Sequence, residues 1–156
     1  MVDAERKRKV LLVGSSGGHL AQLLSLRPWW EPLDRLWVTF PTQDSRSLLA
    51  DEDTVWAHHP TTRNLPNALR NLVLGWKVLR RYRPDVVVSS GAGVAFPFFL
   101  AARLLGASTV YIEVFDRIDD PTVTGKLCYP FSDVFMLQWS EQQRFYPRGT
   151  LVGPLL

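Results

Sequence analysis

The chain has 156 residues, of which 46% are apolar, and it carries a formal charge of +3 and one cysteine, Cys128. This length is typical of a single domain with its own core, and this apolar content excludes a disordered chain. One cysteine excludes a disulfide framework and a metal site built from several thiolates. The positive charge favours an anionic partner, but it does not distinguish a phosphorylated ligand from nucleic acid or an acidic membrane.

Residues 1–8 form a charged, basic segment that we predict to be a flexible lead-in to a single domain over 9–156. No apolar stretch long enough for a signal peptide adjoins it. The most apolar segment, 91–105, is shorter than the about 20 residues that a membrane-spanning helix needs, and it contains Arg103. This segment is therefore predicted to be a buried or interfacial helix.

The first strand is predicted at 10–13 and the first helix at 18–26, joined by the loop Gly14-Ser15-Ser16-Gly17-Gly18-His19. Glycines at a strand-to-helix turn let a ligand approach free N–H groups and the positive end of the helix dipole. Serine hydroxyls add donors, so the loop is a candidate anion site formed by Ser15, Ser16, Gly17 and Gly18. The alternative is a tight turn whose glycines serve only the backbone.

Trp29 and Trp30 fall in a predicted loop at 29–32, where they either cover the edge of the core or lie in a membrane interface. A second strand is predicted at 36–40, followed by a short helix that ends at 49 and a weak strand at 55–58. His58 and His59 come at the end of that strand. No carboxylate stands beside them at ligand spacing, so no metal site is predicted.

A helix with an apolar stripe and a solvated, arginine-rich face is predicted at 66–82. Three consecutive valines at 86–88 indicate a strand over 84–90 that is buried on both faces, and a second glycine loop follows it, Ser89-Ser90-Gly91-Ala92-Gly93. The remaining elements are predicted to be helix 94–105, strand 108–112, helix 122–131, strand 133–137 and a short strand at 151–152.

This alternation of strands and helices predicts an α/β, Rossmann-like domain with a mostly parallel sheet and helices on both faces. Ligands of such sheets bind at the carboxyl ends of the strands. The two glycine loops and the segment from Glu113 to Arg117 all follow predicted strands, so we expect them to meet at that edge.

We therefore predict an acid/base and diphosphate site, in which His19 or Glu113 accepts a proton. His19 would stand at a helix start, where the dipole disfavours the imidazolium. Further binding residues are expected to be Ser90, Gly91, Gly93 and Arg117. The alternatives are that His19 only fixes its loop and that Glu113 only pairs with Arg117.

Several spaced motifs carry a resemblance to one group of proteins. They are the Gly-x-x-Gly-Gly-His loop at 14–19, the strand and loop at 84–91, the run from Val110 to Arg117, the helix residues 124–127, and Gln138-Trp139. In this order they resemble the acceptor half of MurG-type GT-B glycosyltransferases. They are closer still to the half-length GT-B acceptor subunits of the Alg14, PssD and CpsF type, over residues 9–154.

The resemblance implies an acceptor-binding and membrane-recruiting subunit of a two-component, inverting, UDP-sugar-dependent glycosyltransferase. Such an enzyme would extend a polyprenyl-diphosphate-linked saccharide in exopolysaccharide or capsule biosynthesis, with the donor domain on a separate chain. This chain alone would then be inactive, and no cofactor, metal or nucleic-acid partner is implied.

The resemblance also implies a cytoplasmic location, peripheral on the inner face of the plasma membrane. Eukaryotic relatives have an N-terminal membrane helix where this sequence has the basic run at 6–9. Membrane contact would therefore use basic and aromatic surface, including the lead-in, Trp29 and Trp30.

Two other functions stay open at this point. One is a non-catalytic scaffold that recruits and activates a complete enzyme. The other is a Rossmann oxidoreductase, which fits less well because the first loop lacks the Gly-x-Gly-x-x-Gly order and strand 36–40 ends without an acidic residue for a ribose.

Overall fold

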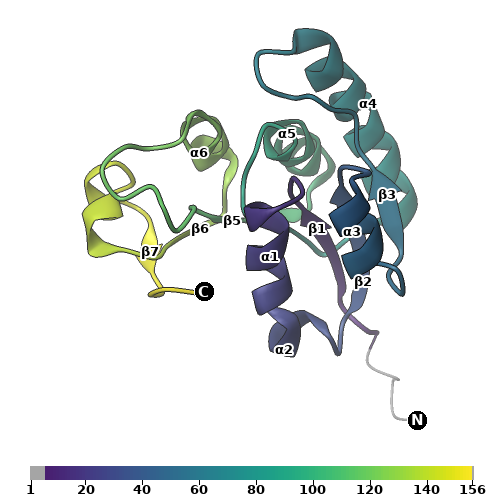
Figure 1. Ribbon diagram of the computed structural model, residues 1–156, viewed down its shortest axis with the longest axis horizontal. Coiled ribbons are helices and arrows are strands. Elements are labelled where there is room, and N and C mark those ends of the chain that lie inside the picture. The colour runs from purple at the N-terminus through teal and green to yellow at the C-terminus, as the bar shows by residue number, and fades with distance from the viewer. Residues whose placement is uncertain (1–5, 156) are drawn as a thin grey trace.

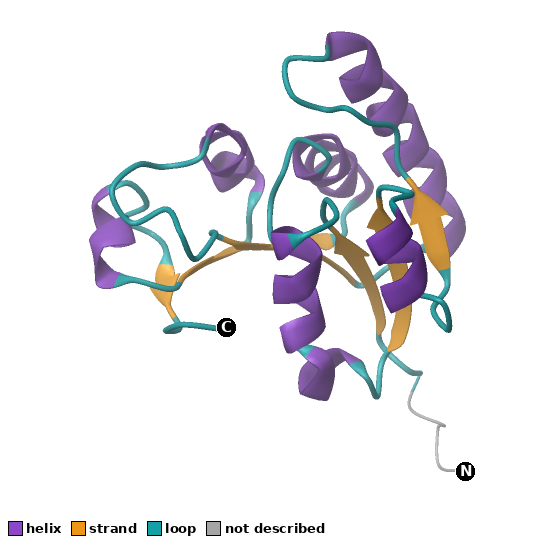
Figure 2. Cartoon of the chain, in the orientation of Figure 1, coloured by secondary structure: helices purple, strands orange, loops and turns teal. Residues whose placement is uncertain are grey.

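The computed structural model describes residues 6–155, which form one seven-stranded sheet in which every strand pair is parallel. The strand order is β3-β2-β1-β4-β5-β6-β7. Figure 2 shows the strands as a single twisted layer between helices. The bounds are β1 (Lys9–Val13), β2 (Asp34–Thr39), β3 (Thr54–Trp56), β4 (Val86–Ser89), β5 (Ser108–Ile112), β6 (Val134–Leu137) and β7 (Thr150–Leu151).

Helices cover both faces of the sheet, so the predicted fold class is confirmed (Figure 1). One face packs on α4 (Leu65–Tyr82), α5 (Ala95–Leu105) and α6 (Val123–Cys128), and the other packs on α1 (Gly18–Ser25), α2 (Arg27–Trp30) and α3 (Gln43–Leu48). The central strand β1 serves both cores, because Leu11 and Val13 face the first set of helices while Val10 and Leu12 face the second.

Successive strands are added first on one side of β1 and then on the other. The chain runs from β1 through β2 to β3 at one edge, and then returns through α4 to place β4 on the free side of β1. The register pairs Val13 with Ser89, so the loops that follow β1 and β4 leave the sheet side by side. Such a switch point is where doubly wound sheets bind their ligands.

The two tryptophans at 29 and 30 differ from the predicted loop, because they lie in the short helix α2. Pro28 stands in its first turn, where the missing N–H is not needed. Trp30 is 2% exposed and donates from its indole nitrogen to the Leu23 carbonyl, while Trp29 is 47% exposed. Only one of the two is therefore available to a membrane.

The helix predicted at 122–131 is divided in the structure. α6 ends at Cys128 and a 3-10 turn, η1 (Tyr129–Phe131), follows, because Pro130 has no N–H to continue the α-helical ladder. A second 3-10 turn that the sequence did not predict, η2 (Ser140–Arg144), comes after β6.

The described part of the predicted lead-in, residues 6–8, lies against the amino-terminal edge of the sheet. Arg6 pairs with Asp85 at 2.6 Å, and the Arg8 carbonyl accepts a hydrogen bond from the N–H of Asp34. Residues 1–5 of that segment lie outside the described range.

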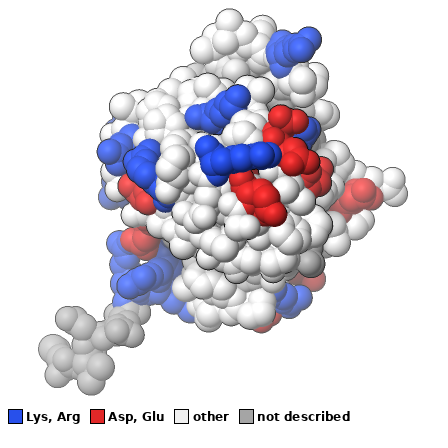
Figure 3. Space-filling model, turned by 90° about the vertical axis from the view of Figure 1, so that its left-hand side faces the viewer, with Lys and Arg blue, Asp and Glu red and all other residues white. Residues whose placement is uncertain are grey.

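Within residues 6–155, none of the helices combines the length and apolar character needed to cross a bilayer. On the face seen from the α6 and β7 side, acidic and basic side chains are interspersed among uncharged ones (Figure 3). The net positive charge does not gather into one patch there.

Candidate functional site

His19 and Ser90 join the two glycine loops through a pair of hydrogen bonds. Nδ1 of His19 lies 2.8 Å from the backbone oxygen of Ser90, and the Ser90 hydroxyl donates to the backbone oxygen of His19, also at 2.8 Å. These residues follow β1 and β4, so the pair holds His19 at the switch point of the sheet.

This contact determines which nitrogen of His19 is available to a ligand. A carbonyl oxygen can only accept, so Nδ1 carries the proton in its bond to Ser90. The lone pair of the neutral ring is then on Nε2, which has no hydrogen-bond partner within the described residues. His19 is partly exposed, so its geometry suits a proton acceptor.

A crevice of about 540 Å³ opens in front of the two loops. The predicted residues that line it are Ser15, Ser16, His19 and Gly93. The sequence did not predict the rest of the lining, which comes from the segments after β2 and β3, from the second loop and from α6: Phe40, Thr42, His59, Pro60, Thr61, Thr62, Ala92 and Thr124. These residues could have been found, because most of them also follow strands of the same sheet.

The second glycine loop has a backbone that side chains do not readily tolerate. Gly91 has φ 112°, and a Cβ there would lie 2.8 Å from the Tyr111 hydroxyl and 3.2 Å from the His19 ring. A Cβ on Gly93 would lie 2.8 Å from Thr61. Ala92 between them has φ 65°, a left-handed conformation that is rare for a residue with a side chain. The loop thus packs closely against the His19 ring at Gly91 and against Thr61 at Gly93.

The first glycine loop leaves the start of α1 open. Gly17 has φ 75°, and no atom lies within 4 Å of the Cβ positions of Gly17 or Gly18. A ligand can therefore approach the N–H groups of the first turn of α1.

A second hollow, of about 340 Å³, lies on the other side of His19. His19 lines both spaces, and the remaining lining is Gly18, Gln22, Val114, Phe115 and Asp116. Gln22 is 2% exposed, and its Nε2 is buried without a hydrogen-bond partner in the described chain. This nitrogen is enclosed by the protein, so it is not exposed to a ligand in the hollow.

The structure corrects the prediction that Glu113 faces the crevice. Glu113 is 0% exposed, and its carboxylate accepts hydrogen bonds from the hydroxyls of Tyr146 (2.5 Å) and Thr122 (3.1 Å) and from the N–H of Val114 (3.0 Å). Burial raises the pKa of this carboxyl, and the hydrogen bonds oppose that shift. Enclosed in this way, Glu113 cannot reach a ligand in the crevice.

Two further predicted residues are also placed differently. Ser90 is buried, and its hydroxyl is occupied by the His19 carbonyl, so it holds His19 instead of facing a ligand. Arg117 is exposed, lines neither hollow and makes no ion pair with Glu113. Its carbonyl accepts a hydrogen bond from Gln142.

His58 and His59 do not form part of a metal cluster in the described chain, where no three His, Cys, Asp or Glu side chains gather closely enough. The ring of His59 instead lies 5.4 Å from the ring of Phe40, and both residues line the crevice.

The fold is the one found in one half of GT-B proteins. The crystal structure of Acinetobacter baumannii MurG superposes with a TM-score of 0.71 at 20% identity, covering 86% of this chain and 42% of MurG. A UDP-N-acetylglucosamine 2-epimerase from Rickettsia bellii superposes with a TM-score of 0.76 at 15% identity, covering 96% and 45%. The chain thus spans less than half the length of these solved structures.

Residues 57–155 match the family described as oligosaccharide biosynthesis protein Alg14 like, and the chain belongs to that family. It is 26% identical to the UDP-N-acetylglucosamine transferase subunit ALG14 of Homo sapiens, over 99% of this chain and 86% of that protein. The same subunit of Candida albicans is 26% identical over 94% of this chain and 77% of that protein.

A transferase of Syntrophotalea carbinolica, named for pyrophosphoryl-undecaprenol and N-acetylglucosamine, is 26% identical over 97% of this chain and 38% of its own length. The resemblance found in the sequence motifs is therefore confirmed, and the oxidoreductase alternative loses its basis.

Proposed function

We propose that this chain is the acceptor-binding subunit of a two-component, inverting, UDP-sugar-dependent glycosyltransferase that extends a polyprenyl-diphosphate-linked saccharide in polysaccharide biosynthesis. The observation that carries the proposal is the bond between Nδ1 of His19 and the Ser90 carbonyl, which leaves Nε2 free at the edge of the crevice. The names of the human and Candida relatives, each a transferase subunit, support the two-component organisation.

In the proposed reaction, Nε2 of His19 takes the proton from the attacking hydroxyl of the acceptor sugar. The hydroxyl oxygen forms a bond to the anomeric carbon of the donor sugar, and the bond from that carbon to the UDP oxygen breaks with its electron pair. UDP leaves, and the configuration at the anomeric carbon inverts. A positioned base of this kind contributes about 10²- to 10⁴-fold to a rate.

The acceptor diphosphate would bind in front of α1. Ser15 and Ser16 line the crevice there, and the open Gly17-Gly18 segment exposes N–H groups at the positive end of the helix. Gly93 adds backbone on the opposite wall. Arg117 has no place in this diphosphate site, since its side chain lies outside both hollows.

We further propose that the outer face of α4 is the surface that meets the inner face of the plasma membrane. Leu65, Leu69, Val73 and Trp76 follow one another at helical spacing and are 70%, 56%, 54% and 37% exposed. A row of exposed apolar side chains on one helix face is typical of an interaction site, and the neighbouring Arg70 supplies charge for anionic lipid.

The position of α4 relative to the crevice favours this surface over Trp29. α4 begins directly after the crevice wall at Thr61 and Thr62, so a bilayer against its apolar stripe would lie next to the crevice mouth. Trp29 shares a hollow with Arg6 and Arg8 at the opposite, amino-terminal edge of the sheet. Because the saccharide and the lipid anchor belong to one acceptor molecule, the crevice that binds the saccharide must lie at the same end of the protein as the surface that contacts the membrane.

The test is reconstitution with a second chain that carries a GT-B donor domain, such as one encoded by a neighbouring gene. The purified chain alone should give no transfer from UDP-sugar to lipid-linked acceptor, and the mixture should give turnover. Robust turnover by this chain alone would contradict the two-component proposal. Turnover in the mixture that survives replacement of His19 would favour the scaffold function.

Membrane attachment has its own test with liposomes that contain anionic lipid. Leu69→Ser/Val73→Ser should weaken binding at least about tenfold. Burying one large aliphatic side chain in the bilayer stabilises binding by about 1.5–3 kcal/mol, and each substitution removes one such side chain. Trp29→Ala is the control and should bind as the unaltered chain does. A loss confined to Trp29→Ala would assign the contact to the other edge.

A further inference from the structure

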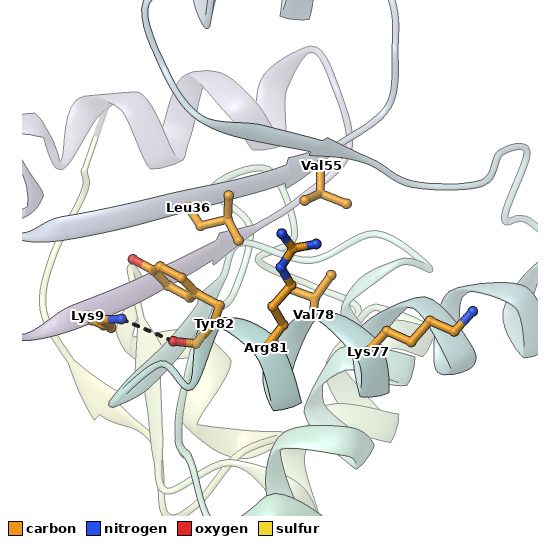
Figure 4. A pocket seen from close by; sticks show the side chains of 7 residues that line it. All are labelled: Lys9, Leu36, Val55, Lys77, Val78, Arg81 and Tyr82. Carbon is orange, nitrogen blue, oxygen red and sulfur yellow. Dashed lines mark hydrogen bonds between the residues drawn. The ribbon is translucent and has the colours of Figure 1, made fainter.

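A groove separate from the crevice lies between the C-terminal half of α4 and the strands β2 and β3 (Figure 4). Its volume is about 480 Å³. Leu36 and Val55 point into it from the strands, and Val78 and the Tyr82 ring point into it from α4. The groove therefore has an apolar floor, and it shares no lining residue with the crevice at His19.

Three cations line the same groove, namely Lys9, Lys77 and Arg81. None of them forms an ion pair with a carboxylate in the part of the chain that the structure describes. Lys9 donates to the Tyr82 carbonyl at 3.4 Å. Lys77 and Arg81 stand one helical turn apart and are exposed, and in Figure 4 the Arg81 side chain points into the groove toward Val55 while that of Lys77 extends away along α4. The Asp34 carboxylate nearby accepts a hydrogen bond from the Tyr82 hydroxyl at 3.0 Å.

We propose that this groove binds one acyl chain of an anionic glycerophospholipid from the bilayer, with the lipid phosphate held by Lys77 and Arg81. The apolar floor and the unpaired cations complement the two parts of such a molecule. A free phosphate ion would leave the floor unused.

The source of the lipid follows from the surface next to the groove. Val73, in the exposed apolar stripe of α4, is four residues before Lys77 and therefore its neighbour on the helix surface. A bilayer in contact with the stripe would place lipid headgroups beside the rim of the groove. The inference goes beyond glycosyl transfer, because a lipid in this groove touches none of the residues proposed to bind or activate the acceptor.

The experiment measures binding of soluble, short-chain phosphatidylglycerol to the full chain by calorimetry. Three comparison ligands are measured in the same way. Phosphatidylcholine with the same acyl chains lacks the net negative charge, inorganic phosphate lacks the acyl chain, and farnesyl diphosphate replaces the acyl chain with an isoprenoid chain. Phosphatidylglycerol should bind at least about tenfold more tightly than each of the other three, as expected for the loss of one charged contact or of the apolar chain.

Variants then locate the binding. Lys77→Glu/Arg81→Glu should weaken phosphatidylglycerol binding at least about tenfold, through lost charge-assisted contacts. The matched control, Arg80→Glu/Arg83→Glu, reverses the same charge at the same end of α4 but outside the groove, and should change binding less than about twofold. Val55→Trp should fill the groove and remove binding, with its thermal unfolding measured alongside.

Equal loss in the two double charge variants would overturn the proposal, because it would show only a response to net charge. Unchanged binding in a folded Val55→Trp chain would also overturn it. Equal or tighter binding of inorganic phosphate or farnesyl diphosphate would reassign the groove to a free anion or to an isoprenoid chain. All of these outcomes leave the proposed chemistry at His19 untouched, so failure here is separable from failure of the proposed function.

Discussion

Two polar clusters lie at the carboxyl-terminal edge of the same sheet, and one is open while the other is closed. At β1 and β4, His19 keeps one ring nitrogen free beside a crevice. At the end of β5, the Glu113 carboxylate accepts hydrogen bonds from the Thr122 and Tyr146 hydroxyls, and the residue is 0% exposed. A position at a strand end therefore brings a residue to the ligand-binding edge without deciding whether it meets the ligand.

The segments that follow the strands account for the difference. After β1 and β4 come glycine loops with positive φ angles, which leave space in front of the sheet. After β5 comes a loop that returns through Thr122 to α6, and α6 packs onto Glu113. Gly125 makes that packing possible, because a Cβ there would collide with Oε2 of Glu113 and lie 2.5 Å from the Tyr146 hydroxyl.

The largest expected effect separates the chemistry of the two clusters. In the reconstituted complex, His19→Gln should lower turnover by about 10²- to 10⁴-fold, because it removes the proposed proton acceptor. Glu113→Gln should lower turnover per folded complex by less than about tenfold, since the carboxylate touches no ligand. Rates are to be divided by the folded fraction measured by circular dichroism. The reverse order of the two effects would return the role of base to Glu113.

The next effect tests how tightly the second cluster is closed. Gly125→Ala should lower the free energy of unfolding by about 1–3 kcal/mol, the usual result of overpacking a filled site. Gly18→Ala is the control, because its Cβ would point into open space, and it should change stability by no more than about 0.5 kcal/mol. Urea unfolding of both variants measures the difference. Equal stability would mean that α6 does not press on Glu113.

A pH series sharpens the comparison further. Burial raises the pKa of Glu113 above its ordinary value of 4.5, so the folded state binds this proton more tightly than the unfolded state. The contribution of Glu113 to the free energy of unfolding is then largest at low pH and falls as pH rises from 4.5 through the folded pKa.

Glu113→Gln lacks this titration and serves as the reference. The stability of the unaltered chain relative to this variant should decline across that window, by up to about 1.4 kcal/mol per pH unit. Urea unfolding at several pH values checks it. A relative stability that rises with pH would contradict a closed, desolvated carboxyl.

The smallest expected effect lies at the open cluster. Ser90→Ala removes the hydroxyl that donates to the His19 carbonyl, but the backbone oxygen that accepts from Nδ1 remains. The net value of one such hydrogen bond is about 1 kcal/mol, so turnover should fall about fivefold. A loss as large as that of His19→Gln would show that the Ser90 hydroxyl, and not the Ser90 backbone oxygen, fixes the orientation of the His19 ring.

The sequence was sufficient for the fold and for placing His19 at the ligand-binding edge of the sheet. Strand and helix periods are local signals, and the alternation from residue 10 onward led directly to a parallel sheet with helices on both faces, as the structure confirms. His19 was found because a buried strand and a glycine loop precede it within ten residues.

What the sequence could not provide depends on distant contacts. The Tyr146 hydroxyl bonds to Glu113 from 33 positions further along the chain, and no periodic pattern in the sequence predicts that contact. The exposed stripe of α4 shows the same limit, since apolar spacing predicts an amphipathic helix without stating whether protein or another phase covers its apolar face. Trp30 is buried because α2 packs its ring against the ring of Trp37, with 5.4 Å between the two ring centroids.

The position of β1 in the sheet has a consequence for how the chain folds. β1 pairs with β2, which follows it closely, and with β4, which is made much later, and the bond from His19 to Ser90 spans 71 positions. Closing so long a loop is unfavourable until the contacts it brings have formed, so parallel pairing of this kind is slow. During synthesis, the segment through β3 must wait for β4 with one edge of β1 unpaired and open to aggregation. His19 therefore acquires its orientation only when β4 pairs with β1, and a chain that has not reached this step would lack the crevice between the two glycine loops.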